Sequence, residues 1–131
     1  MSLQSVGEKF VELCRQGKNF DVMRTMYSPD IVSVEGDGAE TAGQAAVIRK
    51  SEKWVEVNDF HGETVRGPFF SGGSETSGQF AVFFTLDITR KATGKRLTLE
   101  EVGLYTVKND KITRNSFSMR ESIDRGASAS L

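Results

Sequence analysis

The sequence predicts an α+β fold in which an antiparallel sheet carries helices on one side. Apolar residues recur at helical spacing in the first half of the 131-residue chain, whereas from about Phe60 onward they alternate with a period of two. Helices that precede a run of strands are typical of α+β domains. Gly67, Gly78 and Gly103 are candidate bends or bulges, which would let the sheet curve around the helices.

Two helices are expected at the start of the chain. The first ends near Gly17 and places these apolar residues at helical spacing: Val6, Phe10, Val11, Leu13 and Cys14. The second is short, with Asn19 or Asp21 as its expected cap. Its expected apolar face consists of Phe20, Met23 and either Met26 or Tyr27. The segment Ser28-Pro29-Asp30 should end it, because proline cannot continue the helical hydrogen-bond ladder.

A strand, a loop and a third helix follow. Residues 31–35 have the pattern of a short strand, and the glycines of residues 36–43 predict a loop. The third helix is expected over residues 44–57. Its expected buried positions are Val47, Ile48, Trp54 and Val55.

Four strands complete the predicted sheet. The first covers residues 61–70 and is followed by a glycine-rich loop over residues 71–78. The second, over residues 79–89, has one apolar face made of Phe80, Val82, Phe84, Leu86 and Ile88. After a turn at residues 91–95, residues 97–119 are expected to form a hairpin that turns at Lys108-Asn109-Asp110.

An acidic residue on an apolar strand face is the main candidate for chemistry. Residues two apart in a strand share a face, so Glu101 lies on the same side as Leu99 and Tyr105. Burying a carboxylate is costly unless it is paired or its pKa is raised, and a raised pKa suits general acid–base catalysis. The structural alternative is a paired carboxylate, with its partner among Arg66, Lys53, Arg120 and the backbone amides.

Composition narrows the class of protein. Seventeen Lys and Arg residues against eighteen Asp and Glu residues give a net charge of -1, and their scatter argues against a general nucleic-acid surface. The single Cys14 excludes an internal disulfide and offers no metal-ligand spacing, so we expect no metal site. We also expect no cofactor. No apolar run reaches the length of a membrane span, and the cytoplasm is the default expectation. We expect one domain over residues 1–120 and a flexible tail over residues 121–131.

Several segments together resemble a known superfamily. They are MYSPDIVSVEG, GQAAVIRKSEKW, QFAVFFTLDITRKATGKR and EEVGLYTVKNDKI, with a final SF. From about Ser5 to Met119 the chain resembles the nuclear transport factor 2-like superfamily, and within it the SnoaL-like, polyketide cyclase-like group. The resemblance implies a cone-shaped curved antiparallel sheet wrapped around three N-terminal helices, also called cystatin-like. Members include isomerases, cyclases, dehydratases, epoxide hydrolases and proteins that only bind, so the fold alone does not choose a function.

The catalytic residues of the related enzymes do not carry over to this chain. Alignment on the SVEG segment puts Gly36 at the general-base position of ketosteroid isomerases. Phe10 matches the tyrosine of their oxyanion hole, and Gly103 matches its neutral acid. SnoaL-like cyclases use an aspartate and a histidine in the pocket. The only histidine here is His61, and Asp87, the nearest strand aspartate to it in sequence, lies on the face opposite the expected pocket.

The resemblance nevertheless places the Glu101 face inside a pocket. The candidate catalytic residues are Glu101 as acid or base, with His61 and Tyr105 to polarise a substrate. His61 has an unperturbed pKa near neutrality, although a lone histidine at the start of a strand is more often a rim residue. The expected pocket-lining residues are Tyr27, Trp54, Phe80, Val82, Phe84, Asn115, Phe117 and Met119.

Three functions remain open at this point. The first is binding of a small hydrophobic molecule, with cofactor-free isomerase, cyclase or dehydratase chemistry at Glu101. The second is a non-catalytic binding or protein-interaction module. In the third, side chains fill the pocket and the outer sheet face acts in a complex. In each case we expect a homodimer, because Ala81, Phe83 and Thr85 would leave an apolar patch on the outer face. We expect neither nucleic acid nor a membrane as a partner.

Overall fold

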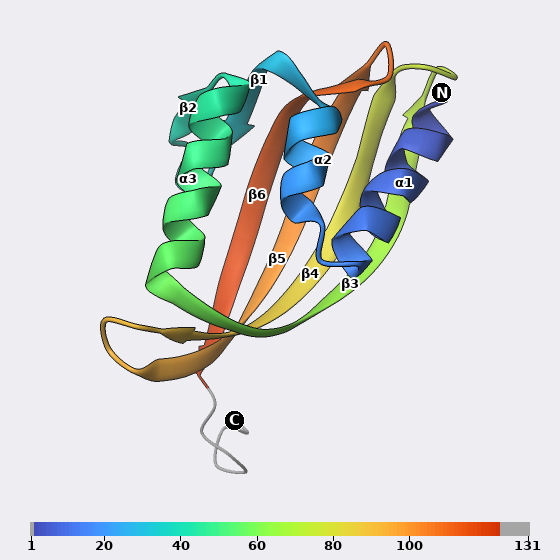
Figure 1. Cartoon of the computed structure of the whole chain (residues 1–131). Helices are drawn as coiled ribbons and strands as arrows, with labels where there is room; N and C mark the ends of the chain where they lie inside the picture. Colours follow the sequence, from blue (N-terminus) through green and yellow to red (C-terminus); the bar gives the residue numbers. More distant parts are fainter. Residues whose placement is uncertain (1, 124–131) are drawn as a thin grey trace.

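Three helices lie on one face of a curved, open, six-stranded sheet (Figure 1). The structure is a computed structural model and describes residues 2–123. The helices are α1 (Leu3–Arg15), α2 (Asn19–Thr25) and α3 (Gln44–Val57). The strands are β1 (Tyr27–Val34), β2 (Glu40–Ala42), β3 (Asn58–Gly73), β4 (Gly78–Arg90), β5 (Lys95–Lys108) and β6 (Lys111–Ile123). Their order across the sheet is β2-β1-β6-β5-β4-β3, and the expected α+β class is confirmed.

α1 begins and packs as its sequence predicts. Ser2 and Ser5 form a capping box, in which Ser2 Oγ accepts from the Ser5 N–H at 3.1 Å and Ser5 Oγ accepts from the Ser2 N–H at 2.8 Å. This exchange satisfies donors that the first helical turn would otherwise leave unpaired. Phe10, Val11 and Cys14 face the sheet and are each only 2% exposed.

α2 differs from the expectation in its cap and in its buried face. Lys18 is the N-cap and makes no side-chain capping bond, so neither Asn19 nor Asp21 caps the helix. Val22 is the residue that the helix buries, whereas Phe20 and Met23 are half-buried. The helix ends at Thr25, before the proline segment, because the chain has already turned into β1.

β1 corrects the prediction of a purely antiparallel sheet. It starts at Tyr27, so Ser28-Pro29-Asp30 lies inside the strand rather than between elements. The pairing register with β6 shifts between Tyr27 and Val32, and such a bulge tolerates proline because no ladder N–H is needed there. β1 runs parallel to β6 and antiparallel to the short β2, which lies within the expected loop.

α3 and the long antiparallel strands agree closely with their sequence patterns. α3 spans the expected residues 44–57 and buries Val47. Ile48 and Trp54 are only half-buried and Val55 is 46% exposed, which corrects the expectation that these three are buried. β3 is longer than expected at both ends, and it bulges near Gly67, which precedes a cis proline and has a φ of +134°. The β5–β6 turn places Asn109 and Asp110 at positive φ, as a tight hairpin turn requires.

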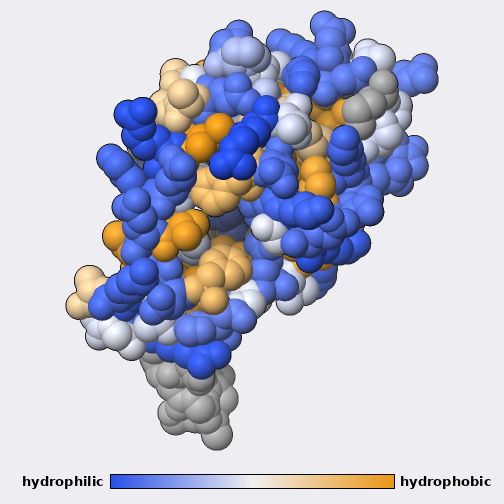
Figure 2. Space-filling view, in the orientation of Figure 1, coloured by the Kyte–Doolittle hydropathy of each residue, from blue (hydrophilic) through white to orange (hydrophobic). Residues whose placement is uncertain are grey.

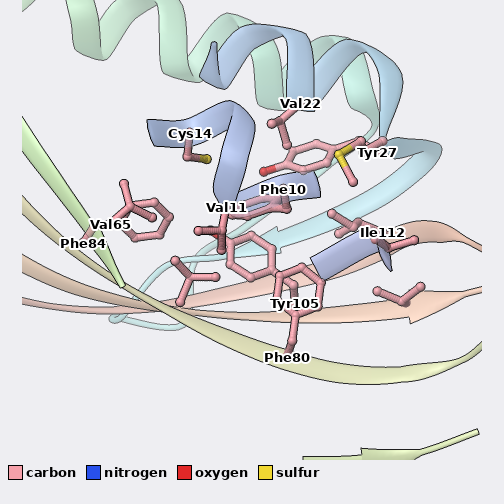
Figure 3. Packing of buried hydrophobic residues seen from close by; sticks show 14 of the residues in the cluster. Phe10, Val11, Cys14, Val22, Tyr27, Val65, Phe80, Phe84, Tyr105 and Ile112 are labelled. Carbon is pink, nitrogen blue, oxygen red and sulfur yellow. The ribbon is translucent and has the colours of Figure 1, made fainter. Parts of the chain in front are cut away.

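The core lies between α1 and the strands β4 and β5 (Figure 3). Phe10 packs against Tyr105, Phe80 and Phe84, with ring centroids 4.4, 5.4 and 6.5 Å away. The expected inner face of β4 is confirmed, because its alternate residues are at most 8% exposed: Phe80, Val82, Phe84, Leu86 and Ile88. Phe83, on the outer face, is 40% exposed.

The end of the chain differs in part from the expected tail. β6 continues to Ile123, past the expected start of the tail at Glu121, and Glu121 forms an ion pair with Arg90 of β4. The rest of the expected tail, residues 124–131, lies outside the described residues. Within residues 2–123, no helix is long and apolar enough to cross a membrane.

Candidate active site

A cavity of about 470 Å³ lies between the helices and the inner face of the sheet. Its wall includes residues from α1, α2 and α3 and from strands β1, β3, β4, β5 and β6. Figure 2 shows the surface hollowed between α3 and α2, with hydrophobic side chains around the opening. The volume falls within the range of small-molecule sites, which argues against the alternative in which side chains fill the pocket.

Most residues predicted to line a pocket do line this cavity. They are Tyr27, Trp54, Phe84, Asn115, Phe117 and Met119. Phe80 and Val82 do not line it, and both are fully buried. Phe80 packs edge-on against Phe10 of α1, so α1 closes this end of the sheet and the inner face of β4 opens into the cavity only from Phe84 onward.

Glu101 reaches the cavity wall from the middle of β5. It is paired across the sheet with Phe84 of β4 and Met119 of β6. It makes no hydrogen bond or ion pair with any of the described residues, and two of its expected partners are engaged elsewhere. Arg120 donates to Glu100 at 3.1 Å, and Arg66 lies over the Phe83 ring at 5.6 Å.

Burial makes the Glu101 carboxyl hard to ionise. The pKa of Glu101 is raised from the ordinary 4.5 to about 7, and removal of the carboxyl from water is the largest cause. The nearby carboxylates of Glu35 and Glu63 contribute to this rise, whereas the ammonium of Lys50 acts in the opposite direction. At neutral pH the group is therefore present in both protonation states, as a general acid or base requires.

Glu63 is a second cavity carboxyl that sequence reasoning missed. It lies on β3, opposite Leu86 of β4, and burial raises its pKa while a hydrogen bond with Asn19 lowers it. The signal was available, because Glu63 is two residues before the buried Val65 in a predicted strand and so shares its face.

His61 lies outside the cavity, which corrects its expected place in the site. The same alternation would have put His61 on the face of Glu63. However, the β3–β4 register shifts between Phe60 and Gly62, and this bulge turns the side chain away. His61 is exposed, and its Nε2 lies 2.7 Å from Thr89 Oγ1. Asp87 is also outside, and it accepts a hydrogen bond from Arg96 at 2.8 Å.

A lysine–glutamate pair occupies one side of the opening. Lys50 of α3 forms an ion pair with Glu35, the residue that follows β1, and its Nζ also lies 3.4 Å from Ser33 Oγ. Both charged side chains are partly exposed. Lys50 is the only cationic side chain among the described residues that line the cavity, and its charge is already matched by Glu35.

Two tyrosines place hydroxyl groups in the same region. Asn115 Nδ2 donates to the Tyr27 hydroxyl at 3.0 Å, which leaves the Tyr27 proton available for a ligand. The Asn115 Oδ1 atom is buried and has no donor among the described residues. Burial raises the pKa of both Tyr27 and Tyr105, so both hydroxyls stay protonated.

Tyr105 depends on the glycine two residues before it. A Cβ atom on Gly103 would lie 2.6 Å from the Tyr105 hydroxyl oxygen and 2.7 Å from the ring. The Tyr105 ring therefore lies over Gly103, toward Glu101, and stacks on Phe80 at 5.2 Å. Gly103 is thus a packing requirement of Tyr105.

The donor set of the cavity suits organic acid–base chemistry. It offers carboxyl groups of raised pKa beside neutral hydroxyls, within an apolar wall. Across the part of the chain that the structure describes, no three His, Cys, Asp or Glu side chains are grouped so that they could hold a metal ion. Cys14 also lines the cavity, and burial raises the pKa of its thiol to about 12, so it stays a neutral thiol.

Comparisons with known proteins agree on the fold. A family model described as a SnoaL-like domain matches residues 1–119. A candidate SnoaL-like polyketide cyclase from Mesorhizobium loti is 40% identical, with a TM-score of 0.83 over 90% of this chain and 99% of that one. No curated protein matches.

Two more distant structures share the fold alone. A candidate polyketide cyclase from Xanthomonas campestris is 16% identical, with a TM-score of 0.67 over 87% of each chain. A candidate isomerase from Bacillus subtilis is 13% identical, with a TM-score of 0.60 over 90% of this chain and 83% of that one.

Proposed function

Starting from the fact that this chain belongs to the SnoaL-like domain family, we propose that it binds a small, mostly apolar molecule and moves a proton on it. Glu101 is the proposed acid or base. One observation carries this proposal: an unpartnered carboxyl on the wall of a cavity of about 470 Å³. A carboxyl that served only to hold the fold together would have a cationic or amide partner, and none of the described residues provides one.

The tyrosine hydroxyl groups would stabilise the negative charge that proton transfer creates on the ligand. Abstraction of a proton next to a carbonyl group builds negative charge on the carbonyl oxygen. The Tyr27 hydroxyl can donate to that oxygen, because its own oxygen already accepts from Asn115. Tyr105 is the other candidate donor. This arrangement supports isomerisation, cyclisation or dehydration without a cofactor, and His61 has no part in it.

Proton exchange tests this function without knowledge of the natural substrate. A hydrophobic ketone such as 4-phenylbutan-2-one, incubated with the protein in deuterium oxide, should lose its α-proton signals in NMR spectra faster than in buffer. Glu101→Gln should slow this exchange by about 100-fold or more, the usual contribution of a general base. The matched control is Glu100→Gln, since Glu100 lies on the outer face and pairs with Arg120.

A non-catalytic binding protein is the alternative. It is favoured by the loss of the three isomerase positions, which are Gly36, Phe10 and Gly103 here. In that case the ketone would raise the melting temperature of the wild-type protein and of Glu101→Gln equally, and neither protein would catalyse exchange. That result would contradict the acid–base role of Glu101, whereas the proposal that the cavity binds a small molecule would stand.

We also propose that two copies associate through the outer face of the sheet. Phe83 is 40% exposed and Phe69 is 53% exposed, and the two rings meet edge to face at 6.1 Å. Such a patch is typical of a contact between proteins. Size-exclusion chromatography with light scattering should give the mass of a dimer, which Phe83→Asp should reduce to that of a monomer. A wild-type protein that is monomeric at every concentration would contradict this assembly.

A further inference from the structure

We propose that the ligand of this cavity is an amine, and that its protonated nitrogen lies beside Glu101 and Glu63. The inference rests on the proposed function in one respect: it assumes that a small, mostly apolar molecule enters the cavity. It adds the charge and the hydrogen-bonding character of that molecule, both of which follow from the groups on the cavity wall.

The charge balance of the wall favours a cation. Glu35, Glu63 and Glu101 all line the cavity, against Lys50 as the cation. Lys50 is paired with Glu35, so no basic side chain among residues 2–123 pairs with Glu63 or Glu101. An anionic ligand would meet two carboxyl groups without a cation of its own, whereas an ammonium group would supply the missing positive charge.

Polar atoms on the cavity wall that lack a hydrogen-bond partner also favour a ligand with hydrogen-bond donors. Glu101 has no hydrogen-bond donor among the described residues, and the buried Asn115 Oδ1 has none either. Tyr105 is 2% exposed, lines the cavity and makes no hydrogen bond with the described residues. A buried carboxyl or carbonyl oxygen that lacks a donor is costly. Ammonium N–H groups would satisfy Glu101 and could share the Tyr105 oxygen.

The apolar part of the wall suits the same ligand. Aromatic side chains line the cavity, among them Trp54, Phe84, Tyr105 and Phe117. Aromatic faces attract alkylammonium groups as well as apolar carbon, so the wall accepts both ends of an arylalkylamine. A carboxylate or phosphate head group would gain nothing from these faces.

Binding of an amine should be coupled to the ionisation of Glu101. The charged groups that influence Glu101 are Glu35 just after β1, Lys50 on α3 and Glu63 on β3. The hydroxyls of Tyr27 and Tyr105 stay neutral across the relevant range. A cation beside Glu101 favours its carboxylate form, so the complex releases a proton. The affinity for the amine should therefore rise with pH between about 6 and 8, as the free protein loses the same proton.

Three probes that share one carbon skeleton test the inference. They are 3-phenylpropylamine, 3-phenylpropan-1-ol and 3-phenylpropanoate, and their dissociation constants are measured by isothermal titration calorimetry near pH 7.5. The amine should bind at least about tenfold more tightly than the alcohol, and the carboxylate more weakly than the alcohol. Titration in two buffers of different ionisation enthalpy should reveal the proton released on binding.

Variants separate the charge of the site from its shape. Glu101→Gln should reduce the preference for the amine over the alcohol to about twofold or less, and Glu63→Gln should reduce it in part. Both variants should bind the alcohol as well as the wild-type protein does. Glu100→Gln, on the outer face, should keep the full preference.

The outcomes distinguish the inference from the proposed function. If the amine and the alcohol bind equally well, the amine inference is wrong and the apolar binding site stands. If the amine is preferred but Glu101→Gln and Glu63→Gln both keep that preference, the inference is wrong about where the ammonium group binds. If none of the three probes binds, the inference and the apolar-ligand proposal are overturned together.

Discussion

At the scale of single residues, the defining feature of the site is that the Glu101 carboxyl has no hydrogen-bond or ion-pair partner among the described residues. A strand carboxyl normally finds an arginine or lysine across the strand, as Glu100 finds Arg120 on the outer face of the same strand. Glu101, one residue later, points into the cavity, where Lys50, the one lysine among the described residues that line it, is already bound to Glu35. Adjacent glutamates with opposite surroundings thus provide both the functional candidate and its natural control.

Gly103 and Tyr105 form a second residue-scale unit. Gly103→Ala should destabilise the protein by about 1–3 kcal/mol, because the new methyl group would displace the Tyr105 ring that lies 2.6–2.8 Å from its position. Urea denaturation monitored by circular dichroism measures this change. Gly62→Ala is the matched control, since a methyl group there meets nothing within 4 Å. Equal stability of the two variants would argue against the packing role of Gly103.

At the scale of elements, the sequence predicts best where local pattern and tertiary packing agree. The period-two pattern of Phe80 to Ile88 identifies β4 and its buried face, and the Glu101 face follows from the same alternation. The β5–β6 turn is signalled by Asn109 and Asp110, which tolerate positive φ. The third helix was predicted with its observed bounds.

The elements that the sequence does not predict are set by distant contacts. β2 is three residues long and exists because it pairs with β1, so its own glycine-flanked residues carry no strand signal. The parallel pairing of β1 with β6 joins segments about 80 residues apart in sequence, as in Val32 with Arg114. The bulge at His61 turns this side chain of β3 outward and so explains the misplaced His61, whereas the inward side of Glu63 follows from plain alternation with Val65.

At the scale of the whole molecule, the fold leaves an open cavity at a cost in stability. Burial raises the pKa of Glu101 above its value in the unfolded chain, so the folded state binds its proton more tightly. Such a group destabilises the fold as pH rises through the interval between the two pKa values. The interval runs from 4.5 to about 7 for Glu101, and Glu63 shifts in the same direction.

This linkage gives a prediction for the variant that removes the charge. Glu101→Gln should be more stable than the wild-type protein at pH 8, by an amount on the order of 2 kcal/mol, and the difference should shrink toward pH 4.5. Thermal denaturation of both proteins across this pH range measures it. Glu100→Gln provides the control, and it should show no gain at pH 8, because it loses an outer-face ion pair. A pH-independent difference between Glu101→Gln and wild type would argue against the linkage.

The most direct test of the central claim is the titration of Glu101 itself. Carbon-13 NMR of the glutamate side-chain carboxyls, compared between the wild-type protein and Glu101→Gln, assigns this one group and follows it with pH. The expected result is an apparent pKa of about 7 for Glu101, as its unpartnered position on the cavity wall requires. A titration near the ordinary 4.5 would show a solvated or paired carboxylate, and would contradict the role of Glu101 as the acid–base group of this site.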